Sequence, residues 1–288
     1  MASAVPVSVA VLLLWGISDV LIALGARKAG VAAAVLGGNV VMMLLYAGAS
    51  PFIDLPPLTM GTIPFVLLGG VLSAVGILFY YKGMRQGVVS VVSPIVGCIP
   101  VVAVAITVLF LGERMSWLQV AGAGLAIAGV VLSSLRKGDV FSLNAASLER
   151  GALYGIITLA CWGPYFALID LLTPSLGWFY PIFLTKAVSL MIVAAYFALQ
   201  DAEEGMAWGR IGAWAWLVVV LIGVVEFAGH FLYGYGVGIG QTALVAPIAF
   251  AYPAFTILMA HVLFRERLEK SQYAGVGMAV VGVVMVAL

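Results

Sequence analysis

VVSPIVGCIP, from Val91 to Pro100, and LVAPIAFAYP, from Leu244 to Pro253, are two similar stretches inside long apolar segments. Each carries two prolines six residues apart, and the stretches are separated by 153 residues. Proline removes a backbone hydrogen bond and bends a helix, and packed neighbours can compensate for this inside a membrane. We therefore predict two equivalent bent membrane helices that frame a central cavity, with bends at Pro94, Pro100, Pro247 and Pro253.

The composition is that of a membrane protein. Of 288 residues, 64% are hydrophobic and 9% are charged, whereas soluble domains carry about 25% charged residues. Apolar runs of about 20 residues, each long enough to span a bilayer, follow one another. We expect an all-α membrane protein whose partners are the lipid bilayer and a small-molecule substrate. The net charge of +1 gives no indication of a nucleic-acid partner.

Neither a metal site nor a cofactor is expected. The two cysteines, Cys98 and Cys161, both lie in apolar runs, where a small core residue is the commoner reading. The first apolar run is long enough to be a span and has no cleavage site after it, so no cleavable signal peptide is expected.

Ten membrane spans are expected. They lie at about residues 4–25, 31–49, 60–81, 88–111, 116–135, 150–172, 178–199, 211–236, 241–263 and 270–288. One polar loop, from Arg136 to Arg150, divides them into five and five. The predicted organisation is a first five-helix repeat at residues 1–137, a connecting loop at 138–149 and a second repeat at 150–288.

The two halves align in one register. At an offset of 153 residues, Tyr80 meets Tyr233, and Glu113-Arg114 meets Glu266-Arg267. Glycines align as well: Gly70, Gly76, Gly83, Gly87, Gly122, Gly124 and Gly129 meet Gly223, Gly229, Gly236, Gly240, Gly275, Gly277 and Gly282. A repeat unit with an odd number of spans inserts its second copy upside down. We therefore predict an inverted repeat, a construction common among transporters.

These features together resemble a known family. A Trp-Gly pair opens each half, at Trp15-Gly16 and Trp162-Gly163, and a Gly-Glu-Arg or Arg-Glu-Arg turn precedes each glycine-rich closing span. Over its whole length the sequence resembles the drug/metabolite transporter superfamily, specifically ten-span members with two EamA-type domains. The resemblance implies alternating-access transport of small organic solutes, often export of amino acids or other metabolites. It also implies a cavity lined by the first, third, fourth, sixth, eighth and ninth spans.

The resemblance has one departure. Family members often carry a basic residue in the second span, and the two matching positions here are Asn39 and Lys186, so only the second half keeps the charge.

Ionisable side chains inside the spans are the first candidates for a binding or coupling site, because burying a charge in a membrane costs about 2.5–3.5 kcal/mol or more. Asp19 lies in the first span and Glu226 in the eighth, and His230 follows Glu226 on the same helical face. Glu226 and His230 could exchange protons, bind an ammonium group or form a structural pair. Asp19 could equally be wetted at the span end, and Lys186 could pair with an acid or snorkel to the interface.

Aromatic and amide side chains are the second group of candidates. They suit a solute with an apolar body and a few polar groups, although each alone is as consistent with packing or an interfacial belt. These residues are Trp15, Trp162, Tyr165, Tyr80, Tyr233, Tyr252 and Gln241. His261 is expected at the membrane interface beside the turn from Arg265 to Arg267.

The glycine-rich faces AGAGLAIAG and AGVGMAVVG of the fifth and tenth spans allow close helix packing. They could join the two halves or two protomers. We favour contact within one chain, and expect a monomer or a weak homodimer.

Basic residues are confined to one side of the predicted topology. The loops after the first, third, fifth, seventh and ninth spans hold all of them except Arg114 and Lys186. The positive-inside rule then places these loops in the cytoplasm and both termini outside, in the inner (plasma) membrane. The family resemblance would instead favour cytoplasmic termini.

The function expected is secondary transport of amino acids or related metabolites, proton-coupled or facilitative. Efflux of drugs or organic cations, and a non-transport membrane role, are the alternatives. The chain carries no H-E-x-x-H, G-x-S-x-G or phosphate-loop motif, so no enzyme is expected.

Overall fold

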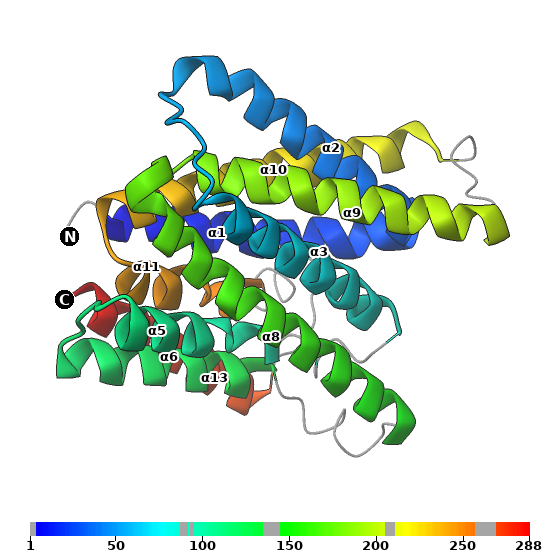
Figure 1. Cartoon of the computed structure of the whole chain (residues 1–288). Coiled ribbons are helices and arrows are strands. Elements are labelled where there is room, and N and C mark those ends of the chain that lie inside the picture. The colour runs from blue at the N-terminus through cyan, green and yellow to red at the C-terminus, as the bar shows by residue number, and fades with distance from the viewer. Residues whose placement is uncertain (1–3, 87–91, 93–94, 135–144, 205–210, 257–268) are drawn as a thin grey trace.

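The computed structural model describes residues 4–86, 92, 95–134, 145–204, 211–256 and 269–288, and these residues fold into helices without any strand (Figure 1). The α-helices are α1 (Ala4–Lys28), α2 (Val31–Ala49), α3 (Ile63–Gln86), α5 (Ile99–Phe110), α6 (Trp117–Ser134), α8 (Ala145–Leu176), α9 (Tyr180–Glu204), α10 (Ala213–Ile239), α11 (Thr242–Ala249) and α13 (Lys270–Ala287). A short 3-10 helix, η1 (Ser50–Phe52), follows α2.

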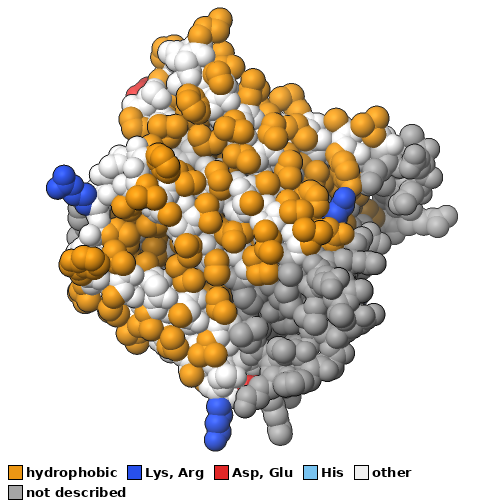
Figure 2. Space-filling view, turned by 60° about the horizontal axis from the view of Figure 1, so that its bottom comes forward, with side chains coloured by type: hydrophobic (Ala, Val, Ile, Leu, Met, Phe, Trp, Pro, Cys, Tyr) orange, Lys and Arg blue, Asp and Glu red, His pale blue; other side chains and the backbone are white. Residues whose placement is uncertain are grey.

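The helices have the length and composition of membrane spans. Six are long and apolar enough to cross a bilayer: Ala4–Ala26, Val31–Phe52, Ile63–Gly83, Leu153–Leu176, Tyr180–Leu199 and Ala213–Ile239. The remaining predicted spans coincide with shorter apolar helices at Ile95–Phe110, Trp117–Leu132, Thr242–Thr256 and Lys270–Val286. The face of the molecule seen in Figure 2 is covered with hydrophobic side chains and carries few charged ones. The chain is therefore an integral membrane protein.

The proline-bearing segments are interrupted and not merely bent. The helix gives way to a turn at Cys98 in the first segment and at Phe250 and Ala251 in the second. Pro100 and Pro253 lie just after these turns. Neither has an N–H to donate to the carbonyl four residues earlier, so the α-helical ladder cannot run through either position. Pro94 lies outside the described residues.

The backbone makes the same hydrogen bonds at both interruptions. Cys98 N–H donates to the Ile95 carbonyl at 3.1 Å, and Ala251 N–H donates to the Ile248 carbonyl at 3.3 Å. One turn later, Cys98 and Ala251 accept in the same way, from Val101 at 2.9 Å and from Ala254 at 3.1 Å. These bonds span three residues and not four, so both segments tighten locally at equivalent positions.

Helix packing pairs elements of the first half with elements of the second half. The most extensive contacts are those of α6 with α13, α1 with α10, and α3 with α8. Figure 1 shows α5, α6, α11 and α13 together on one side of the bundle. The remaining long helices pack above them, with α10 also against α2 and α3 also against α9.

Glycines set the crossing of α6 and α13. A Cβ atom at Gly122 would lie 2.8 Å from the carbonyl oxygen of Gly282, and one at Gly129 would lie 2.6 Å from that of Gly275. The helix backbones approach this closely only because these positions have no side chain. The glycine-rich faces therefore pack against each other within one chain, as the sequence indicated.

Candidate functional site

A cavity lies among the long helices, with about 740 Å³ of space not filled by atoms and partly open to the surroundings. Most of its lining is aromatic or aliphatic, and five polar or charged side chains interrupt this lining: Asp19, Asn39, Lys186, Glu226 and His230. Apolar walls with a few polar groups are typical of sites for small organic molecules.

The spans that line the cavity differ from those expected. Residues of α2 and α9 contribute to the wall, including Asn39 and Lys186, whereas no lining residue comes from the described part of the fourth span. The ninth span contributes Phe250 and Tyr252, which flank its interruption. Of the two proline segments, the second thus contributes to the cavity wall, whereas the described part of the first packs against α8 and α11.

Asp19 faces the cavity from α1. The hydroxyl of Tyr80 on α3 donates a hydrogen bond to Asp19 Oδ1 at 2.9 Å. The carboxylate is thus held by a partner from another helix at the wall of the cavity.

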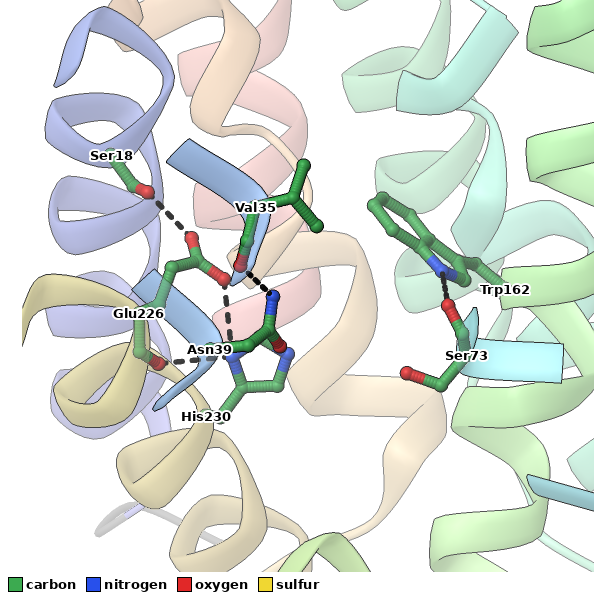
Figure 3. A network of polar contacts seen from close by, with 7 residues as sticks. All are labelled: Ser18, Val35, Asn39, Ser73, Trp162, Glu226 and His230. Carbon is green, nitrogen blue, oxygen red and sulfur yellow. Dashed lines mark hydrogen bonds and ion pairs between the residues drawn. The ribbon is translucent and has the colours of Figure 1, made fainter. Parts of the chain in front are cut away.

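Glu226 lies on α10, in a network that Figure 3 shows. The Ser18 hydroxyl donates to Glu226 Oε1 at 2.5 Å. His230 Nδ1 lies 2.9 Å from the Glu226 backbone oxygen and 3.5 Å from Oε2. Since a carbonyl can only accept, this geometry places a proton on Nδ1. Because Ser18 and Asp19 are adjacent on α1, the two carboxylates are held side by side.

Lys186 is the cation of the cavity and is only 4% exposed. Its Nζ lies 5.4 Å from the ring centroid of Tyr165, a cation–π contact. No carboxylate oxygen lies within 4.0 Å of Nζ among the residues that the structure describes. The side chain is buried and does not snorkel, and the Glu226 carboxylate is close enough to interact with its charge electrostatically. Its counterpart Asn39 also lines the cavity, and its amide donates to the Val35 carbonyl at 2.7 Å.

The two tryptophans of the Trp-Gly pairs occupy corresponding places. Trp15 lies against Gly229 and Trp162 against Gly76, and these glycines align in the repeat. Trp162 Nε1 points to the Ser73 carbonyl at 3.4 Å, as Figure 3 shows. Trp15 Nε1 is buried without a hydrogen-bond partner. Both indoles line the cavity.

Aromatic rings close one end of the cavity. Trp15 stacks on Tyr233 at 5.6 Å between ring centroids, and Phe166 packs edge-on against Phe250 at 4.8 Å and against Tyr233 at 4.9 Å. We call Trp15, Phe166, Tyr233 and Phe250 the aromatic barrier. Tyr233 is fully buried in it and does not line the cavity.

Most predicted site residues converge on this cavity. The residues that line it are Trp15, Asp19, Tyr80, Trp162, Tyr165, Glu226, His230 and Tyr252. Gln241 instead lies at the start of α11, beside Arg114 and Gln119 in a small surface hollow. His261 lies outside the described residues.

Sequence reasoning missed several contributors. Ser18 binds Glu226, and Tyr81, Phe166 and Phe250 form part of the wall. Ser18 and Tyr81 directly adjoin Asp19 and Tyr80 in the sequence, and this adjacency could have identified them as candidates. Phe166 and Phe250 carry no such signal, because a phenylalanine in an apolar span is usually a packing residue.

Fold and site define an integral membrane protein with a mostly apolar cavity, lined by a few polar and charged side chains, inside a helical bundle. The family model described as the EamA-like transporter family matches residues 2–135 and 149–288. The chain belongs to that family, and its resemblance to the drug/metabolite transporter superfamily is confirmed.

Individual relatives are distant. A protein of Streptantibioticus cattleyicolor, described as a "Probable terminal-alkyne amino-acid exporter", is 27% identical over 168 residues, 51% of this chain and 55% of that protein. An uncharacterised protein of Methanocaldococcus jannaschii is 32% identical over 71 residues, 25% of this chain and 52% of that protein. The matches thus span about half the length of these curated relatives.

One solved crystal structure of a protein superposes with a TM-score of 0.75 at 19% sequence identity, covering 98% of this chain and 95% of that one. At this identity the likeness shows a shared fold.

Proposed function

We propose that the protein is a secondary transporter that exports amino acids or related metabolites by alternating access through the central cavity. The observation that carries this proposal is the presence of one buried cation and two carboxylates in the same aromatic-walled cavity. A zwitterionic solute would satisfy both kinds of charge, with its carboxylate at Lys186 and its ammonium group at Asp19 and Glu226. The aromatic rings would receive its apolar body.

The lack of an ion pair at Lys186 supports this assignment. A buried charge normally finds an opposite charge, because an unpaired one is costly in a low-dielectric environment. Among the described residues Lys186 contacts the Tyr165 ring and no carboxylate within 4.0 Å. Glu226 interacts with Lys186 only from a greater distance, and an anionic group on the solute would supply a direct partner.

Corresponding helix contacts in the two halves support an inverted repeat of five spans each, the organisation that alternating access uses. The Trp15–Gly229 and Trp162–Gly76 contacts correspond, as do the interruptions at Cys98 and Ala251. We propose the boundaries 1–137 and 150–288 for the repeats, joined by residues 138–149. Because α6 and α13 pack within the chain, a monomer is the proposed unit.

The position of the cavity supports export. On α1, α2 and α3 its lining residues lie toward the ends at Lys28, Val31 and Gln86. Those ends lead into the basic loops, which the positive-inside rule places in the cytoplasm. We propose that in this orientation, in the inner (plasma) membrane, the structure represents a cytoplasm-facing state that can load a solute, with the aromatic barrier on the outer side.

Proton coupling is the proposed energy source, and Glu226 is the residue proposed to carry it. Its carboxylate has a hydroxyl donor, Ser18, and a histidine within 3.5 Å, so a proton can be accepted and shared there. Facilitated transport without coupling is the alternative within the same fold.

Counterflow in proteoliposomes tests these proposals. Vesicles are preloaded with a mixed pool of amino acids and metabolites, with and without a pH gradient, for the wild-type protein and for Glu226→Gln. Glu269→Gln, at the start of α13, serves as a matched control. Flux that depends on the gradient and loses that dependence only in Glu226→Gln supports a proton-coupled carrier. Flux that is independent of the pH gradient in all variants shows that the protein is a facilitator. The absence of flux for every pool member contradicts transport of these solutes.

Efflux of organic cations is the second candidate function. The cavity holds two carboxylates for one lysine, which favours a solute with net positive charge as much as a zwitterion. Aromatic walls also suit amphipathic cations. Counterflow of an amine that lacks the carboxylate, in competition with the parent amino acid, separates the two candidates.

A further inference from the structure

Glu113 joins the two halves of the protein at the closed end of the bundle. It follows the end of α5, where Gly112 adopts a positive φ of 74° and lets the chain reverse. Glu113 N–H donates to the Thr107 carbonyl at 3.2 Å, which fixes the backbone from which its side chain starts. The carboxylate then reaches α11 in the second half.

The contact is a helix cap provided by the loop between α5 and α6. Thr242 N–H donates to Glu113 Oε1 at 2.7 Å, and Ala243 N–H donates to Oε2 at 2.8 Å. These are the first two residues of α11, whose own N-cap residue, Gln241, makes no side-chain capping bond. The first N–H groups of a helix have no partner within it, and they attract negative charge. Glu113 therefore holds α11 in place from the first half.

This cap lies far from the mouth of the cavity. Gly240, which directly precedes the N-cap residue of α11, packs against the first residue of α1: a Cβ atom at Gly240 would lie 2.8 Å from Ala4. The cavity residues of α1 begin at Trp15 and end at Ile22. At 1.5 Å per residue, these residues lie about 16 to 27 Å from Ala4 along the axis of α1. The aromatic barrier, which includes Trp15, lies between the cap and the rest of the cavity.

A second carboxylate lies beside the cap. Asp170, on α8, is close enough to Glu113 for the two negative charges to repel each other. When both carboxylates are ionised they repel each other, so Asp170 opposes the cap that Glu113 forms with the α11 N–H groups.

We propose that Glu113 is a latch that closes the outer side of the protein while the cavity faces the cytoplasm, and that release of its carboxylate from α11 accompanies outward opening. This inference rests on the proposed function for its purpose. The α10–α11 turn and α11 are the elements that move, because α11 continues into the ninth-span residues Phe250 and Tyr252, which line the cavity. Opening at the latch is thereby linked to the wall of the binding site.

Cysteine labelling tests the latch without substrate or transport. In a background with Cys98→Ser and Cys161→Ser, single cysteines are placed at Ala246, buried in α11, and at Met42, buried in the cavity wall. The rates of reaction with a hydrophilic maleimide are measured on purified protein in detergent. Glu113→Gln keeps the shape but loses the charge and one of the two acceptor oxygens.

The expected result is opposite changes at the two positions. In Glu113→Gln, labelling at position 246 becomes about tenfold faster, which corresponds to about 1.4 kcal/mol, as expected for loss of a helix cap. Labelling at position 42 becomes slower, since the outward-open state closes the cytoplasmic side. Asp170→Asn, which removes the repulsion, slows labelling at position 246. Glu269→Gln removes a carboxylate that caps α13 from the adjacent N-cap position, and it should leave the labelling rates at positions 246 and 42 unchanged.

Two results overturn the latch. Faster labelling at both positions in Glu113→Gln means that the fold has loosened generally, and unchanged labelling at position 246 means that the cap does not restrain opening. These outcomes are independent of counterflow. A latch that behaves as expected in a protein without flux contradicts the proposed function alone, and normal flux with unchanged labelling contradicts the latch alone.

Discussion

The indole of Trp15 lies so close to Gly229 that a Cβ atom at Gly229 would be 2.6 Å from Nε1. This contact joins α1 to α10 where both helices line the cavity. Trp162 and Gly76 make the corresponding contact between α8 and α3. The two tryptophans thus fix two walls of the cavity by the same kind of contact, each with a glycine on a helix of the other half.

Substitution of Gly229 by alanine is expected to displace the Trp15 indole and to destabilise the protein by about 1–3 kcal/mol, because a methyl group has no room there. Thermal unfolding in detergent measures this effect. Gly48→Ala on α2 is the control, since a Cβ atom at Gly48 meets nothing within 4 Å. A Gly229→Ala protein as stable as Gly48→Ala would show that the indole is free to move.

The crossing of α6 and α13 gives a second prediction. At Gly282 a Cβ atom would lie 2.6 Å from the Gly122 carbonyl oxygen, which is backbone and cannot rotate away. Gly282→Ala should therefore separate the helices and lower the free energy of unfolding by about 1–3 kcal/mol. Gly277→Ala, on the same helix and facing open space, should be neutral or slightly stabilising. Equal melting temperatures for the two variants would contradict this packing.

Removal of the Lys186 charge tests recognition of a carboxylate. A charge-assisted hydrogen bond contributes about 1.5–3 kcal/mol, so Lys186→Met is expected to lower flux of a zwitterion by about 10- to 100-fold. Counterflow of the matching amine without a carboxylate should change little. Lys82→Met is the matched control, because Lys82 Nζ also lies over aromatic rings, 5.1 Å from that of Tyr196, but outside the cavity. Parallel losses for zwitterion and amine would refute the assignment.

Tyr80 orients Asp19, so loss of its hydroxyl should weaken solute binding without unfolding the protein. Tyr80→Phe removes the 2.9 Å hydrogen bond to Oδ1. A neutral hydrogen bond contributes about 0.5–1.5 kcal/mol and one to a charged group more, so about a tenfold rise in the concentration for half-maximal flux is expected. Tyr235→Phe, at an exposed position of α10, should leave flux unchanged. An unaltered flux curve for Tyr80→Phe would exclude a role for this bond.

The span pattern was predictable because membrane helices are set by local composition. A run of about 20 apolar residues must satisfy its backbone within itself, so the spans at Ala4–Lys28 and Ala213–Ile239 follow directly from the sequence. The intramembrane charges Asp19, Lys186 and Glu226 were predictable as cavity residues for a related reason: a charge inside a membrane is costly, so it is rarely kept facing lipid.

The proline segments were predicted less well. Two prolines per segment indicate a departure from a straight helix, but whether the helix bends or stops depends on which neighbours take up the freed carbonyls. The structure shows a stop at Cys98 and at Ala251, and among the described residues of the two segments those that line the cavity belong to the second.

The sequence by itself determined the number and order of the apolar segments, the doubled motifs and the identity of the buried charges, because these depend on residue type and spacing. Only the tertiary structure decided which groups meet. Ser18 holds Glu226, Lys186 lies over Tyr165, and Glu113 caps α11 across 129 residues of chain. Such partners are set by how helices pack around each other, and helix packing depends on the simultaneous fit of side chains from distant segments.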